Sequence, residues 1–352
     1  MINDQIQKQE GGDRSTNLQG QSIIINQGIS YSDAKEIALD VYKSNFLQLS
    51  QDAAHIARAR AEEITDKFLE KLQKENASAL DSMKEPSMQA ALYEAQKQYA
   101  KTGDKDLEDL LVDILVERAS TPVRNIHQIV LDESLSVAPK LTPEQMDALT
   151  LNFLISKTQN SSLVSLENLR NYLSTHLIPF IDGLSEESSC YEHLEYAGCA
   201  SLMHMGGILQ IEEIFQKQYG GLFSKGFEQE KFETDIGEIS AYAKLLTHCL
   251  HNTNLLQINA VNEEVIKNTC STHGINEETQ SKIINIFNQT SFSTSEIKDY
   301  IIEKAPETKK LFDLWKSSAL SKFALTTVGI AIAQANFRRK TGIKLNLSIW
   351  VK

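Results

Sequence analysis

Cysteine and histidine are the residues of this sequence whose types could bind a metal or supply a nucleophile. They gather in two stretches and one half-site, formed by Cys190, His193, Cys199, His204, His248, Cys249, His251, Cys270 and His273. A structural zinc site takes four ligands in closely spaced pairs. Eight residues separate Cys190 from Cys199, no Cys-x-x-Cys occurs, and Cys270-x-x-His273 has no second pair beside it. We therefore expect buried thiols and imidazoles that hold no metal.

A nucleophilic Cys–His pair could use Cys199 or Cys249, because such partners meet in space rather than in sequence. No flanking signature supports either thiol, and the sequence contains no phosphate-binding glycine loop, nucleophile elbow or zinc-protease helix motif. Paired carboxylates such as Glu62–Glu63 and Glu212–Glu213 fall on helical patterns or at helix starts, where they complement the helix dipole. We assign no catalytic, cofactor-binding or metal-binding residue, and we expect no cofactor. A hydrolase or nuclease with a site of scattered polar residues is the alternative.

Composition predicts a mainly α-helical fold. The 352 residues include only 6 prolines and 7% aromatic residues, so helix breakers and strand formers are both scarce. The net charge of −12 argues against nucleic acid or an anionic membrane as a partner. No run of 18 apolar residues and no secretory leader is found, and the four cysteines are too few for a disulfide scaffold. These features predict a cytoplasmic protein without a membrane segment.

The N-terminal 28 residues form the first expected unit, a flexible tail followed by a short strand. The strand is carried by Ile23, Ile24 and Ile25, three β-branched residues in an uncharged stretch without proline. Such a strand can dock on its own domain or pair with a second copy of the chain. Because no partner strand follows for many residues, we predict that it joins two copies.

A helical bundle is expected over residues 29–140. From Ser32 to about Lys74 apolar residues recur at helical spacing without a breaker, which predicts one rod about 60 Å long. Ala53, Ala57 and Ala61 narrow one face of this rod, and we predict that they allow a close crossing with a second copy. Further helix starts are predicted at Asp104 and at Thr121-Pro122.

The second half holds two similar series of capped helices, which predicts two helical units over residues 141–274 and 275–352. One series starts at Thr142 and the other at Asn276. The segment Leu325-Thr-Thr-Val-Gly329 predicts a short strand, around Phe323–Thr327, and a glycine turn before the last helix, as in winged-helix units. The ending Leu347-Ser-Ile-Trp-Val351 alternates apolar and polar residues and predicts a docked terminal strand.

Two stretches resemble a bacterial family of mostly uncharacterised helical proteins: GISYSDAKEIALDVYKSNF over residues 28–46, and LTTVGIAIA from Leu325 together with LSIWV at the C-terminus. The resemblance covers most of the chain and implies no catalytic residue. The Leu-Thr-x-x-Gly unit is also similar to that of alpha-type abortive-infection proteins, which implies a role in phage defence. We therefore expect a non-enzymatic homo-oligomer that acts as a scaffold, sensor or adaptor toward another protein.

Overall fold

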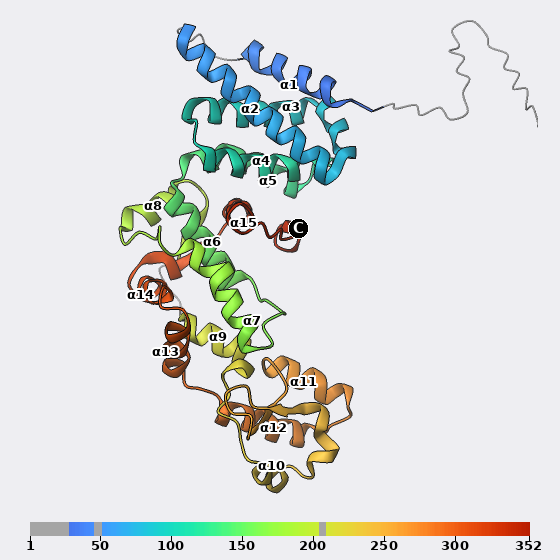
Figure 1. The fold of residues 1–352 in the computed structure, drawn as a ribbon, viewed down its shortest axis with the longest axis vertical. Coiled ribbons are helices and arrows are strands. Elements are labelled where there is room, and N and C mark those ends of the chain that lie inside the picture. The colour runs from blue at the N-terminus through green and yellow to red at the C-terminus, as the bar shows by residue number, and fades with distance from the viewer. Residues whose placement is uncertain (1–27, 46–50, 204–208) are drawn as a thin grey trace, which may run out of the picture.

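The computed structural model describes residues 28–45, 51–203 and 209–352, and the fold over these ranges is mainly α-helical, as the composition predicts. Figure 1 shows an elongated molecule with an N-terminal helical bundle at one end, a central layer around α6 and α15, and a small lobe at the other end. Among the described helices, none combines the length and apolar character needed to cross a membrane. Ile23, Ile24 and Ile25 lie outside the described residues.

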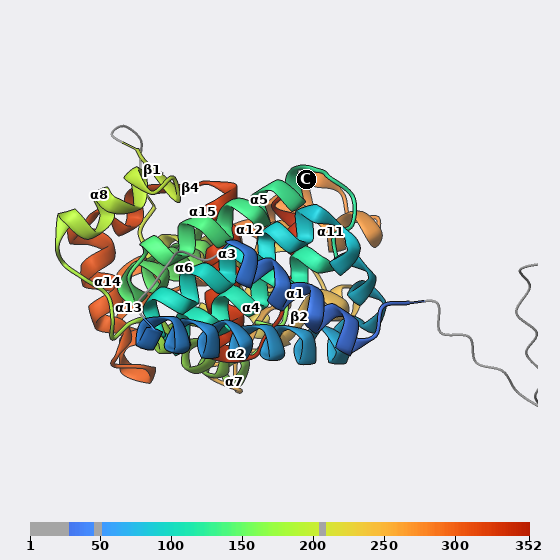
Figure 2. The ribbon, with the colours of Figure 1, turned by 90° about the horizontal axis from the view of Figure 1, so that it is seen from above.

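The N-terminal bundle consists of five α-helices and one 3-10 helix. Their bounds are α1 Tyr31–Asn45, α2 Gln51–Asn76, η1 Ala77–Lys84, α3 Pro86–Thr102, α4 Lys105–Ala119 and α5 Ile126–Val137. Seen from above in Figure 2, α1 and α2 lie in front of α3 and α4. Their apolar faces meet in a continuous core that includes Ile64, Phe68 and Leu111.

The predicted single rod from Ser32 to Lys74 is wrong, because α1 and α2 are separate helices that pack against each other. Tyr31 Oη donates a hydrogen bond of 3.1 Å to Asp66 Oδ1, and Lys35 Nζ lies 2.7 Å from the same oxygen. In one continuous helix Tyr31 and Asp66 would be about 50 Å apart. The apolar surface that seemed too long for one bundle is therefore buried by folding back within the chain.

The central layer is built from helices of both halves of the sequence and one two-stranded sheet. Its elements are α6 Pro143–Lys157, α7 Leu166–Tyr172, α8 Ser188–Tyr196, β1 Ala200–Leu202, α9 Ile211–Tyr219, α13 Thr294–Lys304, α14 Thr308–Ser317, β4 Phe323–Leu325 and α15 Thr327–Thr341. Strands β1 and β4 pair antiparallel, with Ala200 opposite Leu325. Helix α15 packs on α4, α5 and α6, so the end of the chain joins the bundle to the central layer.

The predicted strand before the last helix is confirmed by β4, but the predicted glycine turn at Gly329 is wrong. Gly329 lies in the first turn of α15, which Thr326 caps by accepting a hydrogen bond from the Gly329 N–H. A Cβ at this position would stand 1.9 Å from the carbonyl oxygen of Cys199. Glycine is needed here for the close approach of two backbones and not for a turn.

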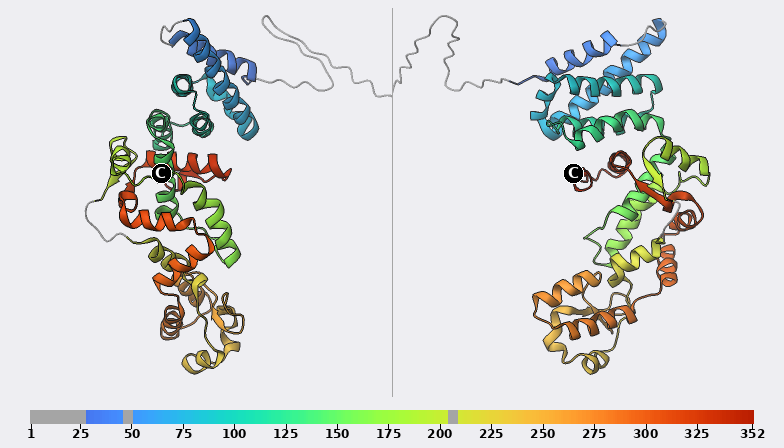
Figure 3. Two further views of the ribbon diagram at one scale, coloured as in Figure 1. Left: turned by 60° about the vertical axis from the view of Figure 1, so that its left-hand side comes forward. Right: turned by 180° about the vertical axis from the view of Figure 1, so that it is seen from behind.

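The small lobe has its own apolar core, which contains Phe232, Ile266 and Ile283. It comprises α10 Gln229–Asp235, β2 Leu246–His248, β3 Leu256–Ile258, α11 Glu263–Thr272 and α12 Glu277–Thr290, with β2 and β3 antiparallel. Figure 3 places it at the far end of the molecule from the N-terminal bundle. The boundary expected between residues 274 and 275 falls inside this lobe, and α6 and α12, the first helices of the two expected units, belong to different cores.

The C-terminal segment docks on α6, but the predicted strand is wrong because Leu347–Ile349 form a 3-10 helix, η8. Leu347 and Val351 are buried, while Ile349 is 59% exposed. Trp350 donates from Nε1 to the Lys157 carbonyl oxygen at 2.9 Å and meets Phe153 edge to face. A helical turn places residues 347 and 349 on different sides, which an extended strand would not do.

Candidate interaction surface

Of the three alanines predicted to contact a second copy, two are buried in contacts within the chain. Ala57 and Ala61 are buried against Tyr42 of α1, and Ala53 is half-buried. Tyr42 Oη donates to the Ala57 carbonyl oxygen at 3.1 Å, and burial raises the pKa of Tyr42 to about 12. The small residues therefore let α1 cross α2 closely, and Ala57 and Ala61 are withdrawn from the surface that a second copy could reach.

The cysteines and histidines do not form a reactive cluster in the part of the chain that the structure describes. Cys199, Cys249 and Cys270 are buried free thiols, and Cys190 is half-buried. No group of three or more His, Cys, Asp and Glu side chains among the described residues is placed to hold a metal. The His251 ring nitrogen Nε2 lies 2.7 Å from the Leu222 carbonyl oxygen. Burial raises the pKa of Cys199 to about 12, which disfavours the thiolate that a nucleophile needs.

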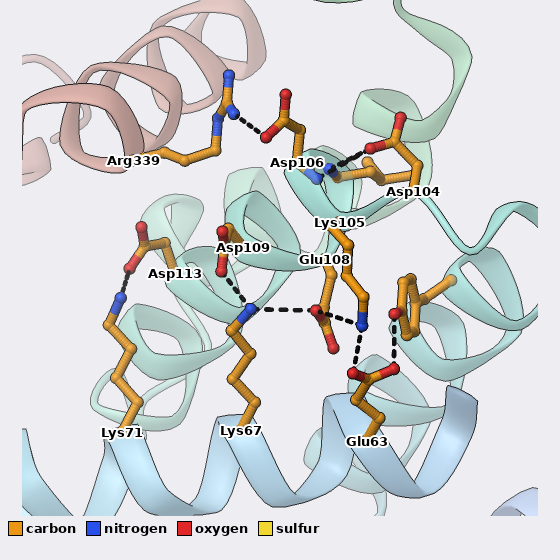
Figure 4. A network of polar contacts seen from close by, with 12 residues as sticks. Glu63, Lys67, Lys71, Asp104, Lys105, Asp106, Glu108, Asp109, Asp113 and Arg339 are labelled. Atoms are coloured by element: carbon orange, nitrogen blue, oxygen red, sulfur yellow. Dashed lines mark hydrogen bonds and ion pairs between the residues drawn. The ribbon is translucent and has the colours of Figure 1, made fainter. Parts of the chain in front are cut away.

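An ionic ladder fixes α4 between α2 and α15. Figure 4 shows Lys67 of α2 paired with Glu108 and Asp109 of α4, and Lys71 paired with Asp113 one turn further on. Glu108 and Asp113 are almost fully buried, so their charges are compensated by lysines that reach in from the surface.

The ladder continues to α15, whose Arg339 lies 2.7 Å from Asp106. Arg338 adds ion pairs to Glu75 and Asp113. The basic C-terminal turn of α15 therefore holds the central layer to the bundle.

A polar groove opens at the end of the bundle where α2 ends and α5 begins. We call it the bundle-end groove; its volume is about 710 Å³, and η1, the start of α3, the end of α4 and the start of α5 line it. The wall includes Asp81, whose Oδ1 accepts a hydrogen bond of 3.0 Å from the Ile29 N–H. Ile29, near the beginning of the described chain, therefore lies beside this groove.

Three exposed apolar side chains lie at the start of α5 and in the connection before it. Val123 is 67% exposed, Ile126 46% and Ile129 39%, and we call these three residues the apolar patch. Val123 lies between Pro122 and Arg124, both of which line the groove. Exposed apolar side chains that gather in one region are typical of interaction sites.

The helix start predicted at Thr121-Pro122 is wrong, because α5 begins at Ile126 and Asn125 is its N-cap. With the helix start moved, residues 121–125 form the connection that carries Val123. The apolar residues Ile126 and Ile129 are three apart and share one face of α5, but it is the face turned away from the core.

These features define a mainly α-helical, multi-helix protein with an ion-paired bundle, a polar groove and an exposed apolar patch. The model of an uncharacterised family matches residues 28–351, and the chain belongs to that family. No curated protein and no solved structure matches the chain.

Proposed function

We propose that this protein is a non-enzymatic, cytoplasmic interaction protein that associates with copies of itself. The observation that carries the proposal is the apolar patch of Val123, Ile126 and Ile129, three exposed apolar side chains at and just before the start of α5. Burying these side chains against a second molecule removes apolar surface from water, at about 25 cal/mol per Å².

The occupant of the apolar patch in this proposal is the segment Ile23–Ile25 of a second copy. This segment is apolar and uncharged, and Ile25 precedes Ile29 by four residues, a span of at most about 14 Å. Because Asp81 holds Ile29 at the bundle end, our proposal puts the segment within that reach of the same end, where a twofold axis would let each copy supply its segment to the other. Both copies would then bury their apolar patch.

The test is the mass in solution of the full chain and of residues 29–352, measured by light scattering. We expect a dimer or larger assembly for the full chain and a monomer for the shortened one. Ile24→Lys and Ile126→Glu should each weaken assembly, whereas Ile349→Glu, a charge at another exposed apolar position, should not.

A monomeric full chain at micromolar concentration would reject the proposal. Loss of assembly in Ile24→Lys but not in Ile126→Glu would move the contact from the apolar patch to strand pairing between the isoleucine segments. With that outcome the proposed self-association would stand, but the apolar patch would not be its site.

The likeness to alpha-type abortive-infection proteins adds a defence role, in which the assembly would recruit a protein partner as a sensor or adaptor. Phage challenge of bacteria that express the full chain or Ile24→Lys tests this addition. Protection by the full chain and its loss in the variant would support the role, and equal plaque counts with and without the protein would remove it. Metal-dependent cleavage of nucleic acid by the purified chain would favour the hydrolase or nuclease alternative.

A further inference from the structure

The bundle-end groove does not stop at the start of α3. A second groove, with a volume of about 320 Å³, shares Ser87 and Asp132 with it and lies between α3 and α5 as far as Glu94 and Ser136. From Ser87 to Glu94 the axis of α3 rises by about 10 Å. We call the two grooves together the extended groove, and its elongated shape suits an extended peptide better than a compact ligand.

The accessible side chains of the extended groove are polar and of mixed charge. Ser78, Ser87 and Ser120 are exposed residues with hydroxyl groups on its wall. Arg124 and Glu85 are exposed as well, and among the described residues neither forms an ion pair. Hydroxyl and amide groups both donate and accept hydrogen bonds, so an uncharged polar segment can bind to a wall of this kind.

The chain carries such a segment directly before its isoleucines. Residues 15–22, with the sequence Ser-Thr-Asn-Leu-Gln-Gly-Gln-Ser, contain no charged residue, and all but Leu18 and Gly20 have a hydroxyl or amide side chain. A segment of this composition buries too little apolar surface to bind by itself. It therefore needs a neighbouring apolar contact, which the isoleucines supply.

The apolar patch and the extended groove meet at Val123. In the proposed function the isoleucines of one copy lie on the apolar patch of another, and Val123 of that patch stands between two residues of the groove wall, Pro122 and Arg124. Residues 26–28 lead back to Ile29, which Asp81 of their own copy holds. Only residues 15–22 are therefore free to continue from the apolar patch into the extended groove.

We infer that the extended groove binds residues 15–22 of a second copy of this chain. The inference rests on the proposed function and adds the polar part of the contact between copies. Eight extended residues span at most about 29 Å, which is longer than the part of α3 that lines the groove. The apolar patch binds the isoleucines, and the hydrogen bonds of the groove set the direction in which the segment runs.

Photo-crosslinking of the full chain tests the inference. Benzoylphenylalanine replaces Gln21 in one sample and Gln7, outside the segment, in the control, and each sample mixes unlabelled chains with chains labelled in heavy nitrogen. After irradiation at a concentration where light scattering shows assembly, mass spectrometry maps the crosslinks. We expect crosslinks from position 21 to residues 78–87 or 120–124 in pairs that join a labelled and an unlabelled chain. Position 7 should give none to these residues.

A variant that fills the groove gives a second measurement. Ser87→Tyr places a large side chain in the extended groove, and crosslinking from position 21 should fall about tenfold, the factor that a loss of about 1.4 kcal/mol produces. Ser281→Tyr makes the same change at an exposed position of α12 and should leave the yield unchanged. If Ser87→Tyr does not fold, Ser120→Tyr, elsewhere on the same wall, takes its place.

Assembly without crosslinks to the extended groove, or equal yields from positions 7 and 21, would overturn the inference and leave the proposed self-association standing. Crosslinks to the groove only within one chain would also overturn it, because the occupant would then be the segment of the same copy. A full chain that light scattering shows to be monomeric would overturn both the self-association and the inference that rests on it.

Discussion

Burial, rather than a charged partner, sets the chemistry of Cys199. The residue is fully buried, and burial raises the pKa of its thiol from 9.0 to about 12. Its carbonyl oxygen accepts a hydrogen bond from the Thr326 N–H, so its backbone serves the contact between the start of α15 and β1. The side chain that the sequence offers as a nucleophile is a packing residue.

The raised pKa of Cys199 predicts a loss of stability in alkali. Between about pH 9 and pH 12 the unfolded chain releases the thiol proton while the folded chain keeps it, so the free energy of unfolding falls as pH rises. The slope from this group is at most about 1.4 kcal/mol per pH unit. Urea unfolding at pH 7 and pH 10.5 should show a smaller alkaline loss in Cys199→Ala than in the unmodified chain. An equal loss in both proteins would contradict the assignment.

At the scale of the elements, close contact between two backbones requires glycine at residue 329, at the start of α15. Gly329→Ala would improve helix propensity by about 1 kcal/mol, but its Cβ would stand 1.9 Å from the Cys199 carbonyl oxygen. We expect a net destabilisation of about 1–3 kcal/mol, because the backbone must shift. Thr327→Ala, at an exposed position of the same turn, should stay within about 0.5 kcal/mol in the same denaturation experiment.

The pairing of α1 with α2 can be tested by distance. Spin labels at Lys35 and Asp66 should lie close together, because these side chains form an ion pair across the two helices. One continuous helix would separate them by nearly 50 Å. Labels at Asp40 and Lys74 report a second pair of positions in the same two helices. A pulsed electron resonance distance near the rod value for Lys35 and Asp66 would reject the hairpin.

The docked C-terminal segment makes a further prediction at this scale. Trp350 is half-buried, with an edge-to-face contact to Phe153 at 4.9 Å and a hydrogen bond to the end of α6. Trp350→Ala should therefore cost about 2–3 kcal/mol, at the low end for a buried aromatic. Ile349→Ala, one residue away and 59% exposed, should change little. Equal melting temperatures for the two variants would show that the segment is not docked.

At the scale of the whole molecule, the lobe core and the main core are separate, which predicts that the two regions open with different free energies of unfolding. The lobe core is small and contains Ile283, whereas the main core runs from α1 to Val351. Ile283→Ala should raise hydrogen exchange in α11, α12 and β2–β3 and leave α2, α4 and α6 protected. Leu111→Ala in the main core is the matched substitution and should raise exchange in the bundle. Uniform acceleration by Ile283→Ala would mean that the molecule unfolds as one unit.

Local chemistry is what the sequence determined by itself. The mainly helical class followed from composition, and the N-caps at Asp104, Thr142 and Asn276 were found because a cap depends on side chains within three residues. The strand at Phe323–Leu325 was found in the same way, from β propensity over a short window.

Contacts between residues distant in sequence were decided only by the tertiary structure. A periodic apolar pattern is the same in one long helix and in two helices that fold back, so the α1–α2 hairpin and the burial of Ala57 could not be predicted. The need for glycine at residue 329 depends on a carbonyl group 130 positions earlier. The bundle-end groove brings η1 to the end of α4 and the start of α5, and the residues that line it have no regular spacing in the sequence. Such sites follow from packing, because a pattern within one element carries no record of which element will lie against it.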